Sequence, residues 1–233
     1  MRSQCRALRN SNCNSVRIEK RCVRTGAPRC PARSCEVRHS TSGMISAHSK
    51  HSEISIVSRR LHIGGQVRTV GWEVLDANPG PCVDHIGNAG DLSAFADDSF
   101  EQLYASHVLE HFDYQRQLLE TLAEWRRVLA PDGTLCVSVP DLDVLARLFL
   151  DRTLLSAQER FLVMRMIFGG HIDKHDYHLV GLNEEFLSSY LHAAGFVGIS
   201  RVANFGLFDD TSSMVLKSIP ISLNMVAKKA ALP

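Results

Sequence analysis

Phe100-Glu-Gln-Leu-Tyr-Ala-Ser-His-Val-Leu-Glu-His111 is the stretch of sequence that decides the fold. Its first half predicts a short apolar strand, and polar, titratable residues begin at Ser106, where that strand should end. Large apolar residues then recur at helical spacing and predict a helix that packs on the core and runs to Ala130 (Leu118, Leu122, Trp125, Leu129). Pro131-Asp-Gly133 ends this helix, and residues 135–139 predict a second buried strand. The order strand, helix, strand indicates a βαβ unit in a parallel sheet.

Ligands of parallel sheets bind beside the carboxyl ends of the strands, which is where Ser106, His107 and His111 fall. His107 and His111 are four residues apart at the expected start of the helix, so we expect them to share one face. This end of the strand is therefore a candidate site.

Charge is distributed unevenly along the 233 residues, although the formal net charge is only +1. Residues 1–43 carry ten Arg or Lys residues and two Glu residues, a net charge of +8. The remainder carries sixteen basic and twenty-three acidic residues, a net charge of −7, which argues against a nucleic-acid partner. No run approaches the ~18 apolar residues of a membrane span.

Residues 1–43 contain five of the seven cysteines and few large apolar side chains. The cysteines could bind zinc, but no Cys-x-x-Cys pair occurs. The segment could also be an organelle transit peptide or a basic arm that contacts nucleic acid. We favour a fourth interpretation, in which it is disordered or untranslated and the protein begins at Met44. Cys82 and Cys136 lie in predicted strands as small core residues, which suits a reduced, cytoplasmic setting.

The body of the chain predicts one α/β domain over residues 56–233. Further strands are expected at 60–63, 71–75, 82–86, 196–203 and 222–227. Ser156-Ala-Gln-Glu159 is a capping-box signature for a helix that ends at Gly169-Gly170, and Asn183 should cap a later helix that closes at Gly195.

Three motifs in this order give the chain a family resemblance: His107-Val-Leu-Glu-His111, Trp125-Arg-Arg-Val-Leu-Ala-Pro-Asp-Gly-Thr134 and Val137-Ser-Val-Pro140. The chain resembles the class I S-adenosylmethionine-dependent methyltransferases, and within them a short branch with a Tyr-His segment and an Ala-Gly-Phe turn, here Asp176-Tyr-His178 and Ala194-Gly-Phe196. The resemblance covers residues 60–203 and the last strand. It implies a doubly wound, mostly parallel, seven-stranded Rossmann-like sheet whose first βα unit is shortened.

The same resemblance implies S-adenosyl-L-methionine as cofactor and places Gly64 and Gly65 against its methionine part. A turn without Cβ atoms lets backbone N–H groups approach a ligand, although a Gly-Gly pair is also common in plain turns. Only eleven residues separate Gly64 from Asp76, too few for the usual loop, full helix and second strand.

Asp76 is expected to accept hydrogen bonds from the two ribose hydroxyls, with a solvated turn aspartate as the alternative. Asn88 and Ala89 are expected at the adenine, where the family usually has Asp. Asp91 is a less favoured substitute, and a plain turn at residues 88–91 remains equally open. Ser106 completes the expected cofactor set.

His107 and His178 are the predicted catalytic residues, because a neutral imidazole can take a proton from an acceptor hydroxyl or amine. His111, Asp176 and Tyr177 are predicted to bind the substrate, with the histidine-rich loop acting as a lid. Capping or core histidines and a plain surface loop are the alternatives. His107 and His111, or the histidines at positions 171–178, could bind zinc, but their spacing matches no standard metal-binding motif. We therefore predict no metal site.

The predicted function is methyl transfer from S-adenosylmethionine to an unidentified small-molecule or glycan-type acceptor. The alternatives are a methyltransferase-like binding module without activity, favoured by the short glycine region and Asn88, and a nicotinamide-dependent dehydrogenase, for which the glycine fingerprint is incomplete. Neither the acceptor nor the oligomeric state follows from the sequence. We further expect His107 and the 176–178 segment to meet at the acceptor cavity.

Overall fold

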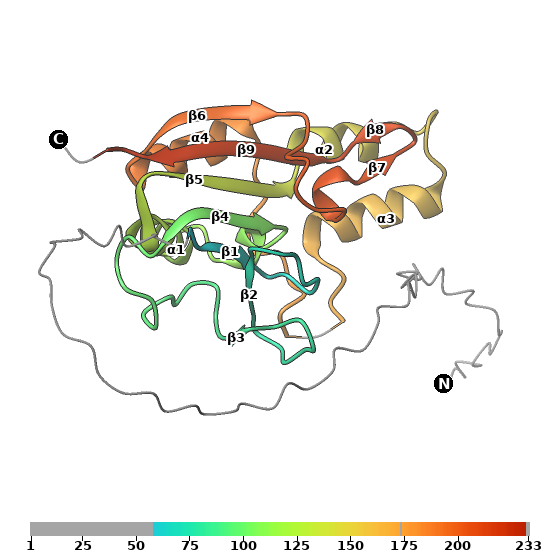
Figure 1. Ribbon diagram of the computed structural model, residues 1–233. Helices are drawn as coiled ribbons and strands as arrows, with labels where there is room; N and C mark the ends of the chain where they lie inside the picture. Colours follow the sequence, from blue (N-terminus) through green and yellow to red (C-terminus); the bar gives the residue numbers. More distant parts are fainter. Residues whose placement is uncertain (1–57, 173, 232–233) are drawn as a thin grey trace, which may run out of the picture. The chain divides into compact units, whose positions relative to one another are not determined.

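Seven strands form one sheet in the order β3-β2-β1-β4-β5-β9-β6 (Figure 1). The computed structural model describes residues 58–172 and 174–231. The strands are β1 (Arg60–Ile63), β2 (Glu73–Asp76), β3 (His85–Ile86), β4 (Phe100–Ser106), β5 (Leu129–Pro140), β6 (Phe196–Val202) and β9 (Ser222–Lys229). Only β9 runs antiparallel to its neighbours, β5 and β6. The predicted mostly parallel, seven-stranded sheet is therefore confirmed.

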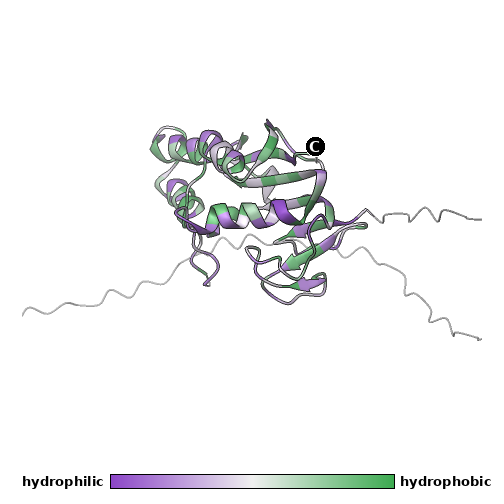
Figure 2. Ribbon diagram, turned by 90° about the vertical axis from the view of Figure 1, so that its left-hand side faces the viewer, coloured by the Kyte–Doolittle hydropathy of each residue, from purple (hydrophilic) through white to green (hydrophobic). Residues whose placement is uncertain are grey.

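Four α-helices accompany the sheet, and their ends follow the capping signals of the sequence. They are α1 (Gln117–Val128), α2 (Leu142–Leu150), α3 (Ala157–Phe168) and α4 (Glu184–Ala193). Ser156 and Glu159 form the predicted capping box at the start of α3, and the Asn183 side chain accepts from the Phe186 N–H at the start of α4. Hydrophilic and hydrophobic stretches alternate along the helices, as expected for one buried and one exposed face (Figure 2).

The two faces of the sheet are covered differently. Leu103 and Ala105 of β4 belong to the main core, which α1 and α4 complete through Leu122, Trp125 and Leu187. Tyr104 points to the other face, as the period of two along a strand requires, and joins a cluster with Phe205 and Phe208 instead of a helix. A third cluster holds α2 and α3 together near the hairpin of β7 (Val215–Leu216) and β8 (Ile219–Pro220) (Figure 1).

The first βα unit is shortened, as predicted. Residues 64–72 connect β1 to the parallel strand β2 without a helix. The connection closes tightly because the Gly64 N–H donates to the Leu75 carbonyl at 2.7 Å. The nine residues cannot hold both a helix and two turns, so the glycine region lies directly beside the end of β2.

Local structure departs from the sequence expectations at three places. β5 begins at Leu129, directly after α1, with Asp132 at φ +61°, so the Pro-Asp-Gly turn lies within the strand. His107 has φ +55° and is followed by a short 3₁₀ helix, η1 (Leu109–His111), so it does not share a helix face with His111. The β7–β8 hairpin was not expected. The predicted segment 1–43 lies outside the described residues, as do residues 56–57 and 232–233 of the predicted domain.

No helix in residues 58–172 and 174–231 is long and apolar enough to cross a membrane.

Candidate functional site

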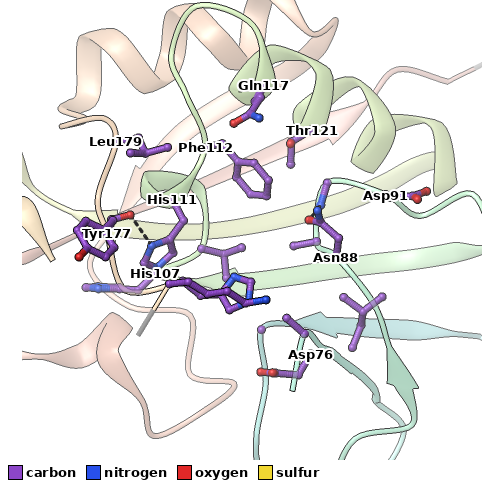
Figure 3. Close-up of a pocket in the computed structure, with 18 of the residues that line it drawn as sticks. Asp76, Asn88, Asp91, His107, His111, Phe112, Gln117, Thr121, Tyr177 and Leu179 are labelled. Atoms are coloured by element: carbon purple, nitrogen blue, oxygen red, sulfur yellow. Dashed lines mark hydrogen bonds between the residues drawn. The ribbon is translucent and has the colours of Figure 1, made fainter. Parts of the chain in front are cut away.

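A pocket of about 720 Å³ opens beside the carboxyl ends of the parallel strands (Figure 3). Its volume lies within the usual range for small-molecule sites. The predicted site residues that line it are Gly64, Asp76, Asn88, Ala89, His107, His111 and Tyr177. Asp76, Asn88 and Asp91 lie toward one end, and His111 and Tyr177 toward the other (Figure 3). The remaining predicted site residues, Gly65, Ser106, Asp176 and His178, do not line it.

Asp76 is the last residue of β2 and is only 8% exposed. Its main-chain carbonyl accepts from the Gly87 N–H at 3.0 Å, which fixes the strand end. Its carboxylate Oδ1 accepts from the Asn78 N–H at 2.7 Å. A carboxylate has lone pairs for further donors, so Asp76 can still accept hydrogen bonds from a ligand in the pocket.

The loop at residues 88–92 is tied to α1. Trp125 Nε1 donates to the Ala89 carbonyl at 2.7 Å, and the Leu92 N–H donates to Glu124 Oε1 at 3.2 Å. Asn88 Oδ1 accepts from the Gly90 N–H at 2.9 Å, so one lone pair of the amide oxygen is already used. The second lone pair and the amide NH₂ group give this end of the pocket one acceptor and one donor.

Gly64 and Gly65 are required for different reasons. Gly64 has φ +74°, and a Cβ there would lie 2.6 Å from Val108 Cγ2, at the wall of the pocket. A Cβ at Gly65 would lie 2.6 Å from the ring of His62. Gly64 therefore keeps the pocket open, whereas Gly65 makes room for a neighbouring side chain.

Ser106 and His107, adjacent at the end of β4, point in different directions. The Ser106 side chain lies on the same face as Tyr104, where its Oγ is 2.8 Å from Thr211 Oγ1. The left-handed backbone of His107 turns the chain into the pocket wall. His107 Nε2 lies 3.0 Å from the hydroxyl of Ser222, the first residue of β9.

Glu110 joins two segments that are distant in sequence. Its main-chain carbonyl accepts from the Leu179 N–H at 2.7 Å, which fastens residues 177–180 to η1. His111 Nδ1 lies 3.0 Å from the Tyr177 carbonyl (Figure 3). The rings of His111 and His178 are 5.0 Å apart at an angle of 75°.

The side chain of Glu110 lies between the two predicted catalytic histidines. Its Oε1 is 3.5 Å from His107 Nδ1 and 4.0 Å from His178 Nε2. His107 and His178 thus approach each other through the buried carboxylate of Glu110 and not across an open cavity. Glu110 is 1% exposed, and neither of its side-chain oxygens has a hydrogen-bond partner within residues 58–172 and 174–231.

Burial sets the ionisation of this group. It raises the pKa of Glu110 to about 8 and lowers the pKa of His107 to about 4. The pKa of His178 is also lowered to about 4, mainly by burial and then by the positive charge of His111. Each shift favours the neutral form, because the loss of water outweighs the smaller opposing effects of Asp210 on His107 and of Asp176 on His178.

Asp176 stabilises the loop at residues 171–178 through hydrogen bonds to its first residues. Its carbonyl accepts from the His171 N–H at 3.0 Å, and its carboxylate Oδ2 accepts from the Ile172 N–H at 3.1 Å. A Cβ on Gly169 or Gly170 would collide with Asp176, which explains the glycine pair. Asp176 therefore shapes the loop that presents Tyr177.

Sequence reasoning missed several residues of the pocket. Phe112, Gln117, Thr121, Lys174 and Leu179 line it. Glu110 was also not predicted as a site residue. The one sequence signal for it is its place between His107 and His111, directly after the apolar residues Val108 and Leu109.

The comparison with known families matches residues 73–137 to the family described as "Methyltransferase domain". This range runs from β2 to the middle of β5 and includes the loop at residues 88–92 and η1. The sheet order, with a single antiparallel strand between β5 and β6, agrees with the mostly parallel Rossmann-like sheet that the family resemblance implies. Residues 73–137 are similar to a methyltransferase domain, and S-adenosylmethionine is the cofactor that this similarity implies.

Solved structures similar to this chain share little sequence with it. The CurJ carbon methyltransferase is 16% identical over 75% of this chain, with a TM-score of 0.46, and the chain spans 49% of that protein. An S-adenosylmethionine-dependent methyltransferase from Archaeoglobus fulgidus is 17% identical over 74% of this chain and 86% of its own, with a TM-score of 0.47. The Burkholderia thailandensis 1,6-didemethyltoxoflavin-N1-methyltransferase, solved with S-adenosylhomocysteine, is 16% identical over 74% of this chain and 72% of its own, with a TM-score of 0.46. No curated protein matches the chain.

The residues that line the pocket fit S-adenosylmethionine. One end offers the Asp76 carboxylate and the Asn88 amide, and the space beside Gly64 is one that a Cβ would fill. A wall of Leu75, Ala77, Val108 and Phe112 supplies apolar contact. The helix that commonly follows β1 in such sheets is absent from the described residues, so its N-terminus cannot contribute to binding here.

Proposed function

We propose that this protein transfers the methyl group of S-adenosylmethionine to a small-molecule or glycan-type acceptor. The observation that carries the proposal is the single pocket wall that joins Asp76 and Asn88 at one end to His107, His111 and Tyr177 at the other. The bound cofactor supplies an electrophilic methyl group on a sulfonium sulfur. The protein then has to align the acceptor, exclude water and receive at most one proton.

The nucleoside end consists of Asp76, Asn88 and Ala89. Asp76 accepts hydrogen bonds from vicinal ribose hydroxyls, and its negative charge strengthens them. Asn88 and the Ala89–Gly90 backbone face the base, held by the bond from Trp125 to the Ala89 carbonyl. Gly64 and Val108 lie between this end and the histidines.

The acceptor end consists of His107, His111 and Tyr177, with His178 behind them. His111 Nδ1 faces a carbonyl, which can only accept, so the ring proton lies on Nδ1 and Nε2 carries a lone pair. His107 and His178 face Glu110, so we assign them to the positioning of this end rather than to direct proton transfer. Lys174 and Tyr177, from the loop above, limit the access of water.

The first prediction concerns the nucleoside end. Asp76→Ala should weaken S-adenosylhomocysteine binding by about 1.5–3 kcal/mol, the range for a hydrogen bond to a charged group. This corresponds to a roughly 10- to 150-fold rise in Kd by calorimetry. Asp209→Ala is the matched control, because Asp209 is exposed and does not line the pocket, so the Kd of this variant should change little.

Three outcomes would contradict the assignment. Unchanged affinity in folded Asp76→Ala protein would remove Asp76 from the cofactor site. Binding of NAD in place of S-adenosylhomocysteine by the wild type would favour a dehydrogenase instead. Tight S-adenosylhomocysteine binding, with no methyl transfer to any of a panel of hydroxyl, amine and thiol acceptors, would favour a binding module.

A further inference from the structure

The acceptor end contains a group of side chains whose nitrogen and oxygen atoms face one another. Ligand atoms of Glu110, His111 and His178 all lie within 4.8 Å of one another. The main-chain bonds from Leu179 and Val180 to the Glu110 carbonyl bring the two segments together. The group is thus built by two independent segments of the chain, η1 and residues 177–180.

Hydrogen counting fixes the protonation of His107. The Ser222 hydroxyl donates its one proton to the Thr211 carbonyl at 2.7 Å. It can therefore only accept from His107 Nε2, 3.0 Å away, so Nε2 carries the ring proton. Nδ1 of the neutral ring then points a lone pair at Glu110 Oε1, 3.5 Å away.

The same reasoning applies to His111. Its Nδ1 donates to the Tyr177 carbonyl at 3.0 Å, which leaves a lone pair on Nε2. Hydrogen bonds of this kind orient the histidine ligands of metal ions and fix their tautomer. His178 Nε2 faces Glu110 Oε1 from the opposite segment, at 4.0 Å.

The group can be completed in two ways. Both oxygens of Glu110 are buried and have no hydrogen-bond partner among the described residues. A buried, ionised carboxylate without a partner is strongly unfavourable, so either a proton shared with His107 Nδ1 or a cation has to lie between these atoms. A cation of suitable size can contact Glu110, His111 and His178 together.

We propose that Glu110, His111 and His178 bind one divalent transition-metal ion, with zinc as the best match. Two imidazoles and one carboxylate, with a fourth position open, form a ligand set of catalytic zinc sites. In a tetrahedral site with bonds of ~2 Å the ligand atoms lie about 3.3 Å apart, so the 4.0 Å between Glu110 and His178 has to shorten by less than 1 Å.

The open position has a defined direction. His111 lines the pocket, whereas Glu110 and His178 lie behind it, so the fourth position faces the acceptor end. A hydroxyl, thiol or amine of the acceptor could bind there and lose its proton more readily beside the ion. This role in catalysis rests on the proposed function, but binding of the ion itself does not.

The test uses the full chain, stripped with a chelator and titrated with ZnCl₂ against a chromophoric competitor. Glu110→Gln and His178→Ala should each lose one zinc equivalent relative to wild type. Their affinity at that site should fall by more than about 100-fold, because loss of a partner outside the coordination sphere alone costs up to that much. His171→Ala, in the same loop but outside the group, is the control and should retain the equivalent.

Co²⁺ as a second probe separates this site from the cysteines of the chain. The band that depends on His178 should lack thiolate-to-metal charge transfer, because the group contains no sulfur. Equal zinc content in wild type and both variants would overturn the proposal, as would the absence of any bound ion in folded wild type. In that case a proton shared between Glu110 and His107 fills the space. S-adenosylhomocysteine binding should survive in both variants, so the outcome is separable from that of the Asp76 experiment.

Discussion

His62 is a buried histidine beside the glycine turn that follows β1. Its ring lies 4.2 Å from that of Phe208 and 4.9 Å from that of Tyr104, and its Nδ1 has no hydrogen-bond partner in the part of the chain that the structure describes. Burial is the main cause that lowers the pKa of His62 from 6.5 to about 4, against smaller opposing effects of Asp210 and Asp76. Folding therefore favours the neutral ring.

The sign of the resulting pH dependence follows directly. Between pH 6.5 and about 4 the unfolded chain binds a proton at His62 that the folded chain does not, so stability falls as the pH drops through this window. The loss amounts to at most about 3 kcal/mol. His62→Leu should flatten this part of the curve of unfolding free energy against pH, measured by urea denaturation.

An exposed histidine provides the control for this prediction. His192→Leu, on the exposed side of α4, should leave the slope of the wild type unchanged. Because His107 and His178 contribute in the same direction, the diagnostic quantity is the difference between wild type and variant. Parallel curves for wild type and His62→Leu would contradict a neutral, buried His62.

The sequence predicts the position of some site residues in the fold but not of others. Asp76, Asn88 and His107 were expected at the pocket because each follows a predicted strand, and strand ends set their location. Ser106 follows the same rule but points to the opposite face, since one residue along a strand reverses the direction. Glu110 could not be predicted as buried, because its burial depends on residues 177–180, nearly seventy positions away.

At the scale of the element, α3 depends on its capping box. The Ser156 hydroxyl accepts from the Glu159 N–H at 3.2 Å, and the Glu159 carboxylate accepts from the Ser156 N–H at 2.8 Å. Ser156→Ala should lower the free energy of unfolding by about 1 kcal/mol, as loss of an N-cap side chain usually does. Ser156→Thr keeps the hydroxyl and should retain most of that stability. Equal stability of the Ala variant in thermal or urea unfolding would contradict the cap.

Elements with local signals were predictable, and elements made by tertiary contact were not. The capping box and helical spacing determine where α3 and α4 begin. The two-residue strands of the β7–β8 hairpin are too short for any periodicity, and they form where Ile219 packs against the cluster of α2 and α3. His107 lies outside any helix, because its backbone is left-handed and its N–H donates to the Ser138 carbonyl of β5 at 2.8 Å.

At the scale of the whole molecule, the antiparallel strand β9 links the sheet to the acceptor end. Ser222, its first residue, accepts from His107 and donates to Thr211, so the strand orders the tautomer of a histidine in the pocket wall. A mostly parallel, seven-stranded sheet with a last strand near residues 222–227 is what the family resemblance implies. The site therefore depends on both ends of the described chain, and no shorter fragment of the sheet would contain it.

The basic, cysteine-rich segment at residues 1–43 can be tested at the same scale. It carries a net charge of +8 and few large apolar side chains, so we expect it to add little to the core. A chain that begins at Met44 should melt at the same temperature as the full chain by differential scanning calorimetry. It should also keep the zinc equivalent that depends on His178, since Glu110, His111 and His178 all lie within the remaining part. A midpoint several degrees lower, or loss of that equivalent on truncation, would show instead that the segment contributes to the fold or supplies the ligands. The shorter chain lacks the five cysteines at positions 5–35, so they cannot bind the ion. Comparing its zinc titration with that of its His178→Ala variant then measures binding at the histidine site alone.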